Sequence, residues 1–215
     1  IWISEVMLQQ TQVSRVVGRY TLFLKKFPNM RALASATPGA VLREWRGMGY
    51  NMRALRLHAL AAHVRDNFRG RLPRDVAMLE ELPGIGPYTA RAVACFSFGA
   101  SVPVLDTNVR RVLSRVFPRQ ARNGKLWNLA TQVLPQRSAY DWNQALMELG
   151  STICVATSPT CTRCPISTFC PSAGKAIRAT SSGRSSERLY DGQPRRIYRG
   201  RIVALLGESS SSGST

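Results

Sequence analysis

The stretch that most constrains the fold is residues 82–111, in which a turn rich in glycine and proline lies between helical patterns. The turn itself, at residues 82–87, reads LPGIGP. Its two glycines allow tight backbone turns that a Cβ atom would hinder. Apolar residues recur at helical spacing over residues 88–98, directly after the turn. The stretch therefore predicts a hairpin between two helices, with a third helix beginning just after Asp106.

Helical periodicity covers most of the chain and indicates an all-α fold. Thr37-Pro38 is typical of a helix start, because a capping hydroxyl precedes a proline at the first helical position. No convincing strand is expected before residue 196. The helices are expected over residues 1–20, 38–46, 53–68, 75–81, 88–98, 108–116, 125–133 and 140–149.

The charge balance predicts a polyanionic partner. The chain has 215 residues, 30 Lys and Arg against 12 Asp and Glu, and a formal net charge of +18. Nucleic acid is the expected partner for such a chain. An anionic membrane and an ordinary solvated surface remain the alternatives. No apolar run is long enough to span a bilayer, and no signal peptide is recognisable.

The glycine turn is also a candidate phosphate site. Successive backbone N–H groups converge where such a turn leads into the next helix, and this arrangement binds a DNA phosphate without reading sequence. The alternative is a plain helix–helix turn that ends in a glycine cap.

Four of the five cysteines form a compact quartet, Cys154, Cys161, Cys164 and Cys170, spaced C-x6-C-x2-C-x5-C. Four thiolates so close together can surround one metal centre, and the spacing alone leaves both zinc and an iron–sulfur cluster open. Disulfides are the competing interpretation, although nothing indicates secretion. Cys95 lies on an apolar helix and is expected in the core.

Together these motifs resemble a known family. LPGIGPYTA at residues 82–90, VLDTNVRRV at 104–112 and the cysteine quartet resemble the helix-hairpin-helix, Gly/Pro-Asp superfamily of DNA glycosylases. The segments IWISEVMLQQTQV at 1–13, GMGY at 47–50 and MELGSTIC at 147–154 resemble its MutY-type adenine DNA glycosylases.

The resemblance implies an all-α helix-hairpin-helix glycosylase fold, with two helical domains flanking a cleft. It assigns the quartet to a [4Fe-4S] cluster loop. The expected domains are a six-helix domain over 1–100, with the hairpin motif at about 78–98, and a cluster domain over 101–175 that pairs with an N-terminal segment missing here. Residues 176–201 are expected to be a basic linker, and 202–215 the start of a truncated C-terminal region or a disordered tail.

The resemblance also implies roles for individual residues. Glu5 matches the catalytic acid and Asp106 the aspartate that defines the superfamily, while Asn108 matches an asparagine near it. Tyr88 occupies the position where bifunctional relatives carry a lysine nucleophile. The residues expected to contact DNA are Gln9, Gln10, Tyr50, Leu82, Gly84, Ile85, Gly86 and Thr89; of these, Gln10 and Tyr50 match residues that wedge into the duplex.

The chemistry needs two carboxyl groups. Protonating adenine at N7 improves a poor leaving group, and an acid with a raised pKa does this at neutral pH. Glu5 stands among Ile3, Val6 and Leu8, which are expected to desolvate it, and shares a helical face with Gln9. A second carboxylate, Asp106, would face the developing sugar cation, as in glycoside hydrolysis. Taken alone, Glu5 is better explained as a solvated residue and Asp106 as a helix cap, and it is the resemblance that favours the catalytic roles.

The predicted function is hydrolysis of adenine mispaired with 8-oxoguanine or guanine, by a monofunctional enzyme that leaves an abasic site, since position 88 carries no lysine. The expected partner is duplex DNA carrying the mispair, without a membrane, and the expected state is a monomer in the bacterial cytoplasm, associated with the nucleoid. The alternatives are removal of thymine from T·G mismatches, which the Gln9-Gln10 pair argues against, and a non-catalytic iron–sulfur module that binds DNA.

Overall fold

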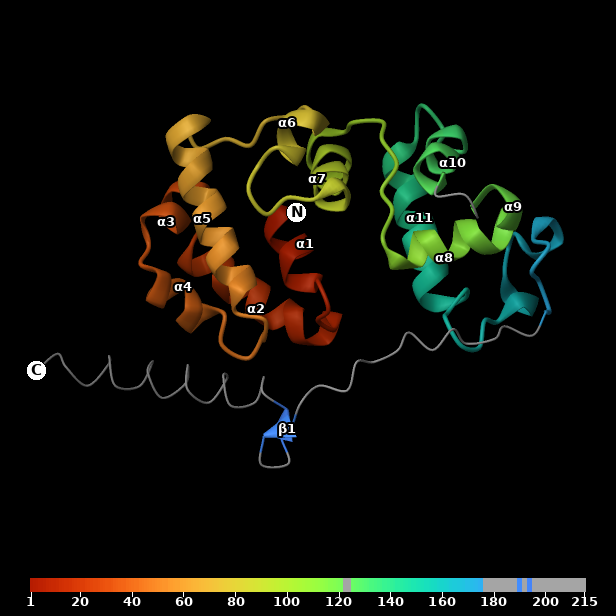
Figure 1. The fold of residues 1–215 in the computed structure, drawn as a ribbon, viewed down its shortest axis with the longest axis horizontal. Coiled ribbons are helices and arrows are strands. Elements are labelled where there is room, and N and C mark those ends of the chain that lie inside the picture. The colour runs from red at the N-terminus through yellow and green to blue at the C-terminus, as the bar shows by residue number, and fades with distance from the viewer. Residues whose placement is uncertain (122–124, 176–188, 191–192, 195–215) are drawn as a thin grey trace, which may run out of the picture. The chain divides into compact units, whose positions relative to one another are not determined.

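A computed structural model of the chain describes residues 1–121, 125–175, 189–190 and 193–194. These residues are almost entirely helical, as predicted (Figure 1). The exception is an antiparallel pair of two-residue strands, β1 (Leu189–Tyr190) and β2 (Gln193–Pro194). The expectation of no strand before residue 196 is therefore wrong, because strands this short show no period-two pattern. The remainder of the predicted linker and the 202–215 tail lie outside the described residues.

The helices follow the predicted order closely and are α1 (Trp2–Leu8), α2 (Val13–Lys26), α3 (Met30–Ser35), α4 (Pro38–Glu44), α5 (Met52–Asn67), α6 (Val76–Glu80), α7 (Pro87–Phe98), α8 (Thr107–Val116), α9 (Pro118–Ala121), α10 (Leu126–Gln132) and α11 (Ala139–Thr152). Two short 3-10 helices, η1 (Cys161–Arg163) and η2 (Ser167–Phe169), follow α11. None of the described helices is long and apolar enough to cross a membrane.

These helices form two compact units. One contains α1–α5 with residues 81–85, and the other contains α6–α11 and the cysteine segment up to residue 175. This division differs from the expected boundary near residue 100. The reason is that α7 packs against α6 and α11, so that the helix after the hairpin groups with the C-terminal half.

In the first unit, α5 is the central helix and contacts α1, α3 and α4. Phe23, Trp45 and Leu57 are essentially inaccessible to solvent, and the ring of Phe23 meets that of Trp45 edge-on at 6.0 Å between centroids. Complete burial of each such side chain stabilises the fold by about 1.5–3 kcal/mol. The predicted cap is confirmed, since the Thr37 hydroxyl accepts a hydrogen bond from the Ala40 amide at 3.2 Å.

The expected continuous helix over residues 1–20 is interrupted. Helix α1 ends at Leu8 and α2 begins at Val13, with Gln10 between them in a left-handed backbone conformation, φ 54°. Gln, Gln and Thr at residues 9–11 are ordinary helix residues and give no local stop signal. The interruption has a tertiary cause, which is described with the site below.

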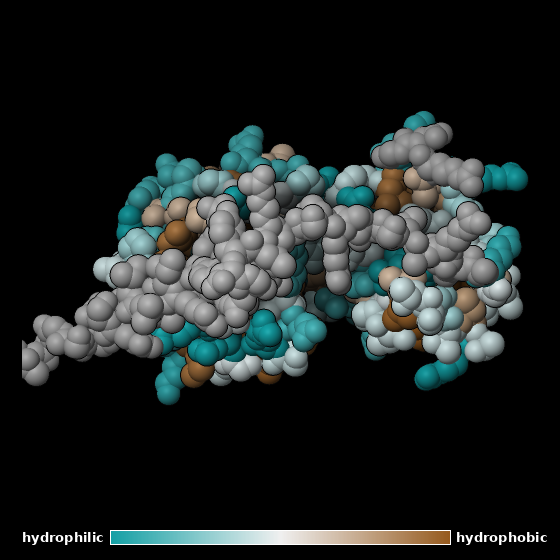
Figure 2. All heavy atoms as spheres, turned by 60° about the horizontal axis from the view of Figure 1, so that its bottom comes forward, coloured by the Kyte–Doolittle hydropathy of each residue, from teal (hydrophilic) through white to brown (hydrophobic). Residues whose placement is uncertain are grey.

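In the second unit, α8 packs on α11 around Leu105, Val112, Leu113 and Leu146, all buried. Cys95 is also buried, as predicted, and burial raises the pKa of its thiol, while a hydrogen bond from Asn143 acts in the opposite direction. On the face shown in Figure 2, hydrophilic residues cover most of the coloured surface, and apolar residues form small separate patches.

Candidate active site

Asp106 is the N-cap of α8 and is half-buried. One carboxylate oxygen accepts a hydrogen bond from the Val109 amide at 2.6 Å, and the other accepts one from the Asn108 side-chain amide at 2.9 Å. The capping interpretation is therefore confirmed. It does not compete with a chemical role, because the two donors fix the orientation of the carboxylate. The structure brings together two of the predicted catalytic residues, Asp106 and Asn108.

The segment that leads into Asp106 is held by a buried side chain that the sequence did not single out. The Asn143 amide oxygen accepts from the Val104 amide at 2.9 Å, and its nitrogen donates to the Val102 carbonyl at 2.9 Å. Asn143 is only 1% exposed. Residues 102–104 are thereby fixed to α11, two residues before the cap.

A second unpredicted residue, Arg111, connects the cap to the cysteine segment. Its guanidinium donates to the Asn108 side-chain oxygen at 2.7 Å and to the carbonyls of Gly150 and Cys154 at 2.5 and 2.7 Å. The sequence gives only one sign of this contact, which is that Arg111 stands three residues after Asn108 on the same helix face. Asp106, Asn108, Arg111 and Cys154 thus form one continuous hydrogen-bonded chain.

Gly150 allows α8 to approach α11 at this point. A Cβ atom added at Gly150 would lie 2.6 Å from the Asn108 Cβ and 3.1 Å from the Asn108 main chain. Real Cβ atoms essentially never come this close to another atom. The glycine in the MELGSTIC segment therefore has a packing role beside the predicted catalytic pair.

Tyr88 lies in the first turn of α7 and is half-buried. It packs against the buried cluster of Ala92, Cys95, Val104 and Ala139. This position contributes to the core of the unit, and its predicted role at the sugar stays a prediction.

The four quartet cysteines line one cavity, although they come from three different segments. Its empty volume is about 410 Å³, including solvent at the mouth. All four thiols are free, which removes the disulfide interpretation. Among the described residues, no three His, Cys, Asp or Glu side chains are grouped closely enough to hold a metal ion.

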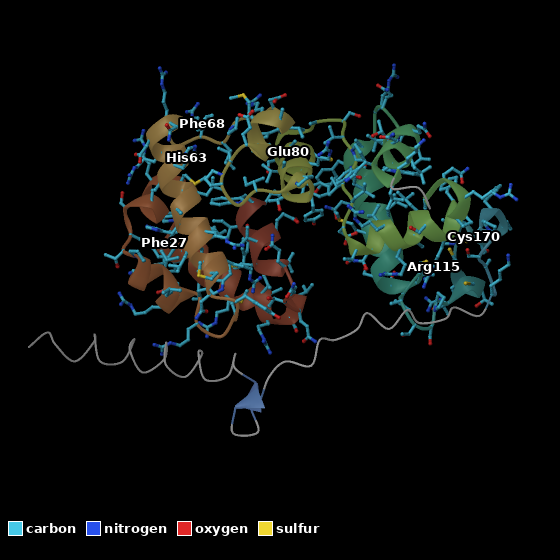
Figure 3. The ribbon with its side chains drawn as sticks, viewed as in Figure 1. Phe27, His63, Phe68, Glu80, Arg115 and Cys170 are labelled. Atoms are coloured by element: carbon cyan, nitrogen blue, oxygen red, sulfur yellow. The ribbon has the colours of Figure 1, made fainter. Side chains whose placement is uncertain are left out.

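Arg115, labelled with Cys170 in Figure 3, makes hydrogen bonds on two sides of this cavity. Its guanidinium lies 3.2 Å from the Cys154 Sγ and also donates to the Val155 carbonyl, while its own carbonyl accepts from the Cys170 thiol at 3.7 Å. Four free cysteines in a cavity otherwise lined largely by apolar residues provide the donor type of a thiolate-ligated cluster, although their side chains are not grouped closely around one point.

The hairpin has the expected backbone geometry. Gly84 adopts φ 83°, a left-handed conformation that favours glycine, and the Ile85 amide closes the turn on the Leu82 carbonyl at 3.1 Å. Gly86 is the N-cap of α7. The side chains of Leu82, Ile85 and Thr89 are buried, so any DNA contact at these three predicted positions belongs to their backbone.

Glu5 is half-buried in α1, next to the buried Val6. Leu8 is 38% exposed, and the expected desolvation of Glu5 stays a prediction. Gln9 lies beyond the end of α1 and does not share a helical face with Glu5, contrary to the expectation.

Gln10 and Tyr50, the two predicted wedge residues, have an unusual feature in common. Both are exposed, and both adopt a left-handed backbone, with φ 54° and 48°. Such a conformation costs a residue other than glycine roughly 1–3 kcal/mol, and it persists only where the surrounding structure enforces it.

The side chain that contacts both of these turns is Arg53, to which the sequence assigned no role. Arg53 is 8% exposed and lies in the first turn of α5. Burial lowers the pKa of its guanidinium, and the nearby Tyr50 partly opposes that shift. Its two terminal nitrogens donate to the Thr11 hydroxyl and to the main-chain carbonyls of Val6, Met7, Gln9, Met48 and Gly49.

Comparison with known proteins identifies the class. Residues 3–134 match the HhH-GPD superfamily of base excision DNA repair proteins, and the chain belongs to this family. The chain is 43% identical to the adenine DNA glycosylase of Mycolicibacterium smegmatis, over 98% of the chain and 72% of that protein. It is 42% identical to the human adenine DNA glycosylase, over 79% of the chain but only 32% of that much longer protein.

Solved structures agree on the fold. A thermostable thymine-DNA glycosylase aligns with a TM-score of 0.77 and 30% identity, covering 81% of this chain and 83% of that one. A trapped covalent intermediate of endonuclease III with DNA aligns with a TM-score of 0.73 and 26% identity, covering 82% and 84% of the two chains. The predicted helix-hairpin-helix glycosylase fold is thus confirmed.

Proposed function

We propose that this chain is an adenine DNA glycosylase, which hydrolyses the N-glycosidic bond of a mispaired adenine during base excision repair. The observation that carries the proposal is the 43% identity to an adenine DNA glycosylase along nearly the whole chain, with both carboxylates of the expected chemistry present. The roles of the individual residues are part of the proposal.

In this mechanism Glu5 donates a proton to N7 of the adenine, which makes the base a better leaving group. As the C–N bond breaks, the sugar acquires oxocarbenium character, and the Asp106 carboxylate stabilises that charge. The hydrogen bonds from Val109 and Asn108 hold the carboxylate in one orientation, so little reorganisation is needed during the reaction. Water then adds to the sugar and leaves an abasic site.

The proposed cofactor is a [4Fe-4S] cluster held by Cys154, Cys161, Cys164 and Cys170. Support comes from the all-sulfur donor set around one cavity and from the guanidinium of Arg115 beside Cys154. Bound there, the cluster would supply four iron–thiolate bonds that tie residues 154–170 together.

The proposed substrate is duplex DNA in which adenine lies opposite 8-oxoguanine or guanine, bound by a monomer in the cytoplasm, at the nucleoid. The net charge of +18 supports a DNA partner. Removal of thymine from T·G mismatches is a second candidate, favoured by the 0.77 TM-score to a thymine-DNA glycosylase. The Gln9-Gln10 pair supports the adenine proposal instead.

A duplex assay tests the proposed reaction. On A·8-oxoguanine DNA we expect a strand break at the adenine after alkali treatment and none before it, because Tyr88 stands where a lyase would need a lysine nucleophile. A·T and T·G duplexes serve as controls. Release of thymine from T·G would favour the second candidate, and a break without alkali would contradict the monofunctional mechanism.

Metal analysis tests the cofactor. The purified protein is expected to contain about four iron atoms per chain, as a [4Fe-4S] cluster requires. Cys161→Ala is expected to lose most of this iron. Cys95→Ala, which changes the buried cysteine outside the quartet, is the matched control and should retain it. Stoichiometric zinc in place of iron would refute the assignment.

A further inference from the structure

We propose that Arg53 is a positioning residue that holds Gln10 and Tyr50 in place as one pair for insertion into the DNA duplex. This inference rests on the proposed function and deepens it, because it identifies the guanidinium that positions the two exposed side chains. Arg53 itself is buried, so the proposed role is to position these two residues and not to contact DNA.

The hydrogen bonds of Arg53 bracket Gln10 on both sides. One terminal nitrogen donates to the Gln9 carbonyl, and the other donates to the Thr11 hydroxyl at 2.9 Å. The residue before and the residue after Gln10 are thus attached to the same guanidinium. This attachment explains why the chain leaves the helix at Leu8 although its sequence has no helix-breaking residue there.

The same guanidinium fixes the Tyr50 turn. It donates to the carbonyls of Met48 and Gly49 at 3.2 and 3.3 Å, and its central carbon lies 5.3 Å from the centre of the Tyr50 ring. The Trp45 ring is at a similar distance, 5.4 Å, and its indole nitrogen also donates to the Gly49 carbonyl at 3.0 Å. Both strained residues are therefore tied to one rigid, planar cation.

Three residues other than glycine have a left-handed backbone in the part of the chain that the structure describes: Gln10, Tyr50 and Arg69. Arg69 follows the end of α5, where left-handed residues are common. The other two are both predicted wedge residues, and both are flanked by contacts of Arg53. A shared anchor accounts for this coincidence.

Holding the two turns with Arg53 also lowers the stability of the fold. All six acceptors of its hydrogen bonds are neutral, and its Nε is buried with no hydrogen-bond partner among the described residues. A buried cation with an unmade hydrogen bond costs stability. A pocket lined by Gln9, Arg53, Arg56 and Gly84 further places this anchor next to the hairpin turn. Strain and unsatisfied polar groups of this kind are typical of functional sites.

Thr11→Val gives a mild test, since it keeps the side-chain volume and removes the hydroxyl that accepts from Arg53 and also donates to the Gln9 carbonyl at 3.3 Å. On A·8-oxoguanine duplex we expect the single-turnover excision rate to fall about tenfold, the change that corresponds to losing one hydrogen bond to a charged group. The dissociation constant for DNA should change by less than about twofold. Thr21→Val, at an exposed threonine of α2, is the matched control and should behave as wild type.

The extrusion of the target base gives a second measurement, which a purely structural defect would leave unchanged. In an Asp106→Asn background, in which cleavage is expected to be slow, 2-aminopurine at the target position should brighten when the base leaves the stack. Thr11→Val should reduce this gain at saturating protein, as should Arg53→Lys, which keeps the charge but not the planar fork. Melting curves would show that the variants are folded.

The same measurement in a Gln10→Ala protein distinguishes a positioning role of Arg53 from general destabilisation. If Arg53 acts through Gln10, adding Thr11→Val to Gln10→Ala should lower the excision rate by less than about twofold, because coupled substitutions are not additive. Equal losses in both backgrounds would overturn the proposal, as would a Thr11→Val protein that matches Thr21→Val throughout. A wild-type protein that neither extrudes nor excises the base would instead refute the proposed function, and the positioning role with it.

Discussion

Replacing Asp106 with Asn is expected to lower the single-turnover rate of adenine excision on the order of 100- to 1,000-fold, while the protein stays folded. The magnitude follows from removing one charge-stabilising group at a polar transition state. The fold survives because the Asn side-chain oxygen can still accept from the Val109 amide and cap α8. A small loss of stability is expected, since the new NH₂ group faces the Asn108 amide nitrogen that now donates to Asp106.

Asp75→Asn is the matched control for this substitution. Asp75 is exposed and accepts a hydrogen bond from the Met78 amide at 3.0 Å, three residues on, so it makes the same type of contact as Asp106. Excision rates and melting temperatures of both variants would be measured on the same A·8-oxoguanine duplex. If the two variants keep equal excision rates, Asp106 is only a helix cap.

Local features of the sequence predicted the local structure well. The hairpin, the helix starts at Thr37 and Asp106, and the burial of Cys95 all depend on residues within a few positions of one another. Capping and helical periodicity are encoded at this short range, which is why they can be read without the fold. The four quartet cysteines also lie within 17 residues of sequence, and the structure places them around one cavity, while the cluster itself stays a prediction.

The contacts that shape the candidate site are not local and were missed. Arg53 reaches carbonyls 44–47 residues away, and Arg111 reaches Cys154 across 43 residues. Nothing near Arg53 in the sequence distinguishes it from any other arginine of a basic chain. The interruption between α1 and α2 was missed for the same reason, since residues 9–12 carry no stop signal and the contacts of Gln9 and Thr11 with Arg53 span more than 40 residues.

The packing role of Gly150 could not be predicted from the sequence either. In the sequence this residue directly follows the helix expected over residues 140–149, whereas the structure places it inside α11, where glycine weakens a helix by roughly 0.5–1 kcal/mol relative to alanine. In the structure it is the point at which α11 makes room for the first turn of α8. The need for glycine at position 150 arises from the contact between α11 and α8. It becomes visible only when the neighbouring residue, Asn108, is known.

Gly150→Ala is therefore expected to be strongly damaging, although alanine is the better helix former. The new Cβ would overlap the Asn108 Cβ at 2.6 Å and crowd its backbone, so the start of α8 must move away from α11. Overpacking of this kind costs about 1–3 kcal/mol. At roughly 2–4 °C per kcal/mol for a protein of this size, the melting temperature should fall by several degrees.

The substitution should also reduce excision more than stability alone explains. Asn108 holds the Asp106 carboxylate, and Arg111 holds Asn108 through a guanidinium that also binds the Gly150 carbonyl. Displacing Asn108 disturbs all three contacts. Gly18→Ala is the matched control, since Gly18 lies within α2 with nothing within 4 Å of an added Cβ, and it should be neutral or slightly stabilising. Equal melting temperatures and excision rates for the two variants would show that α8 and α11 separate without consequence, and that the close approach at Gly150 does not determine the position of Asp106.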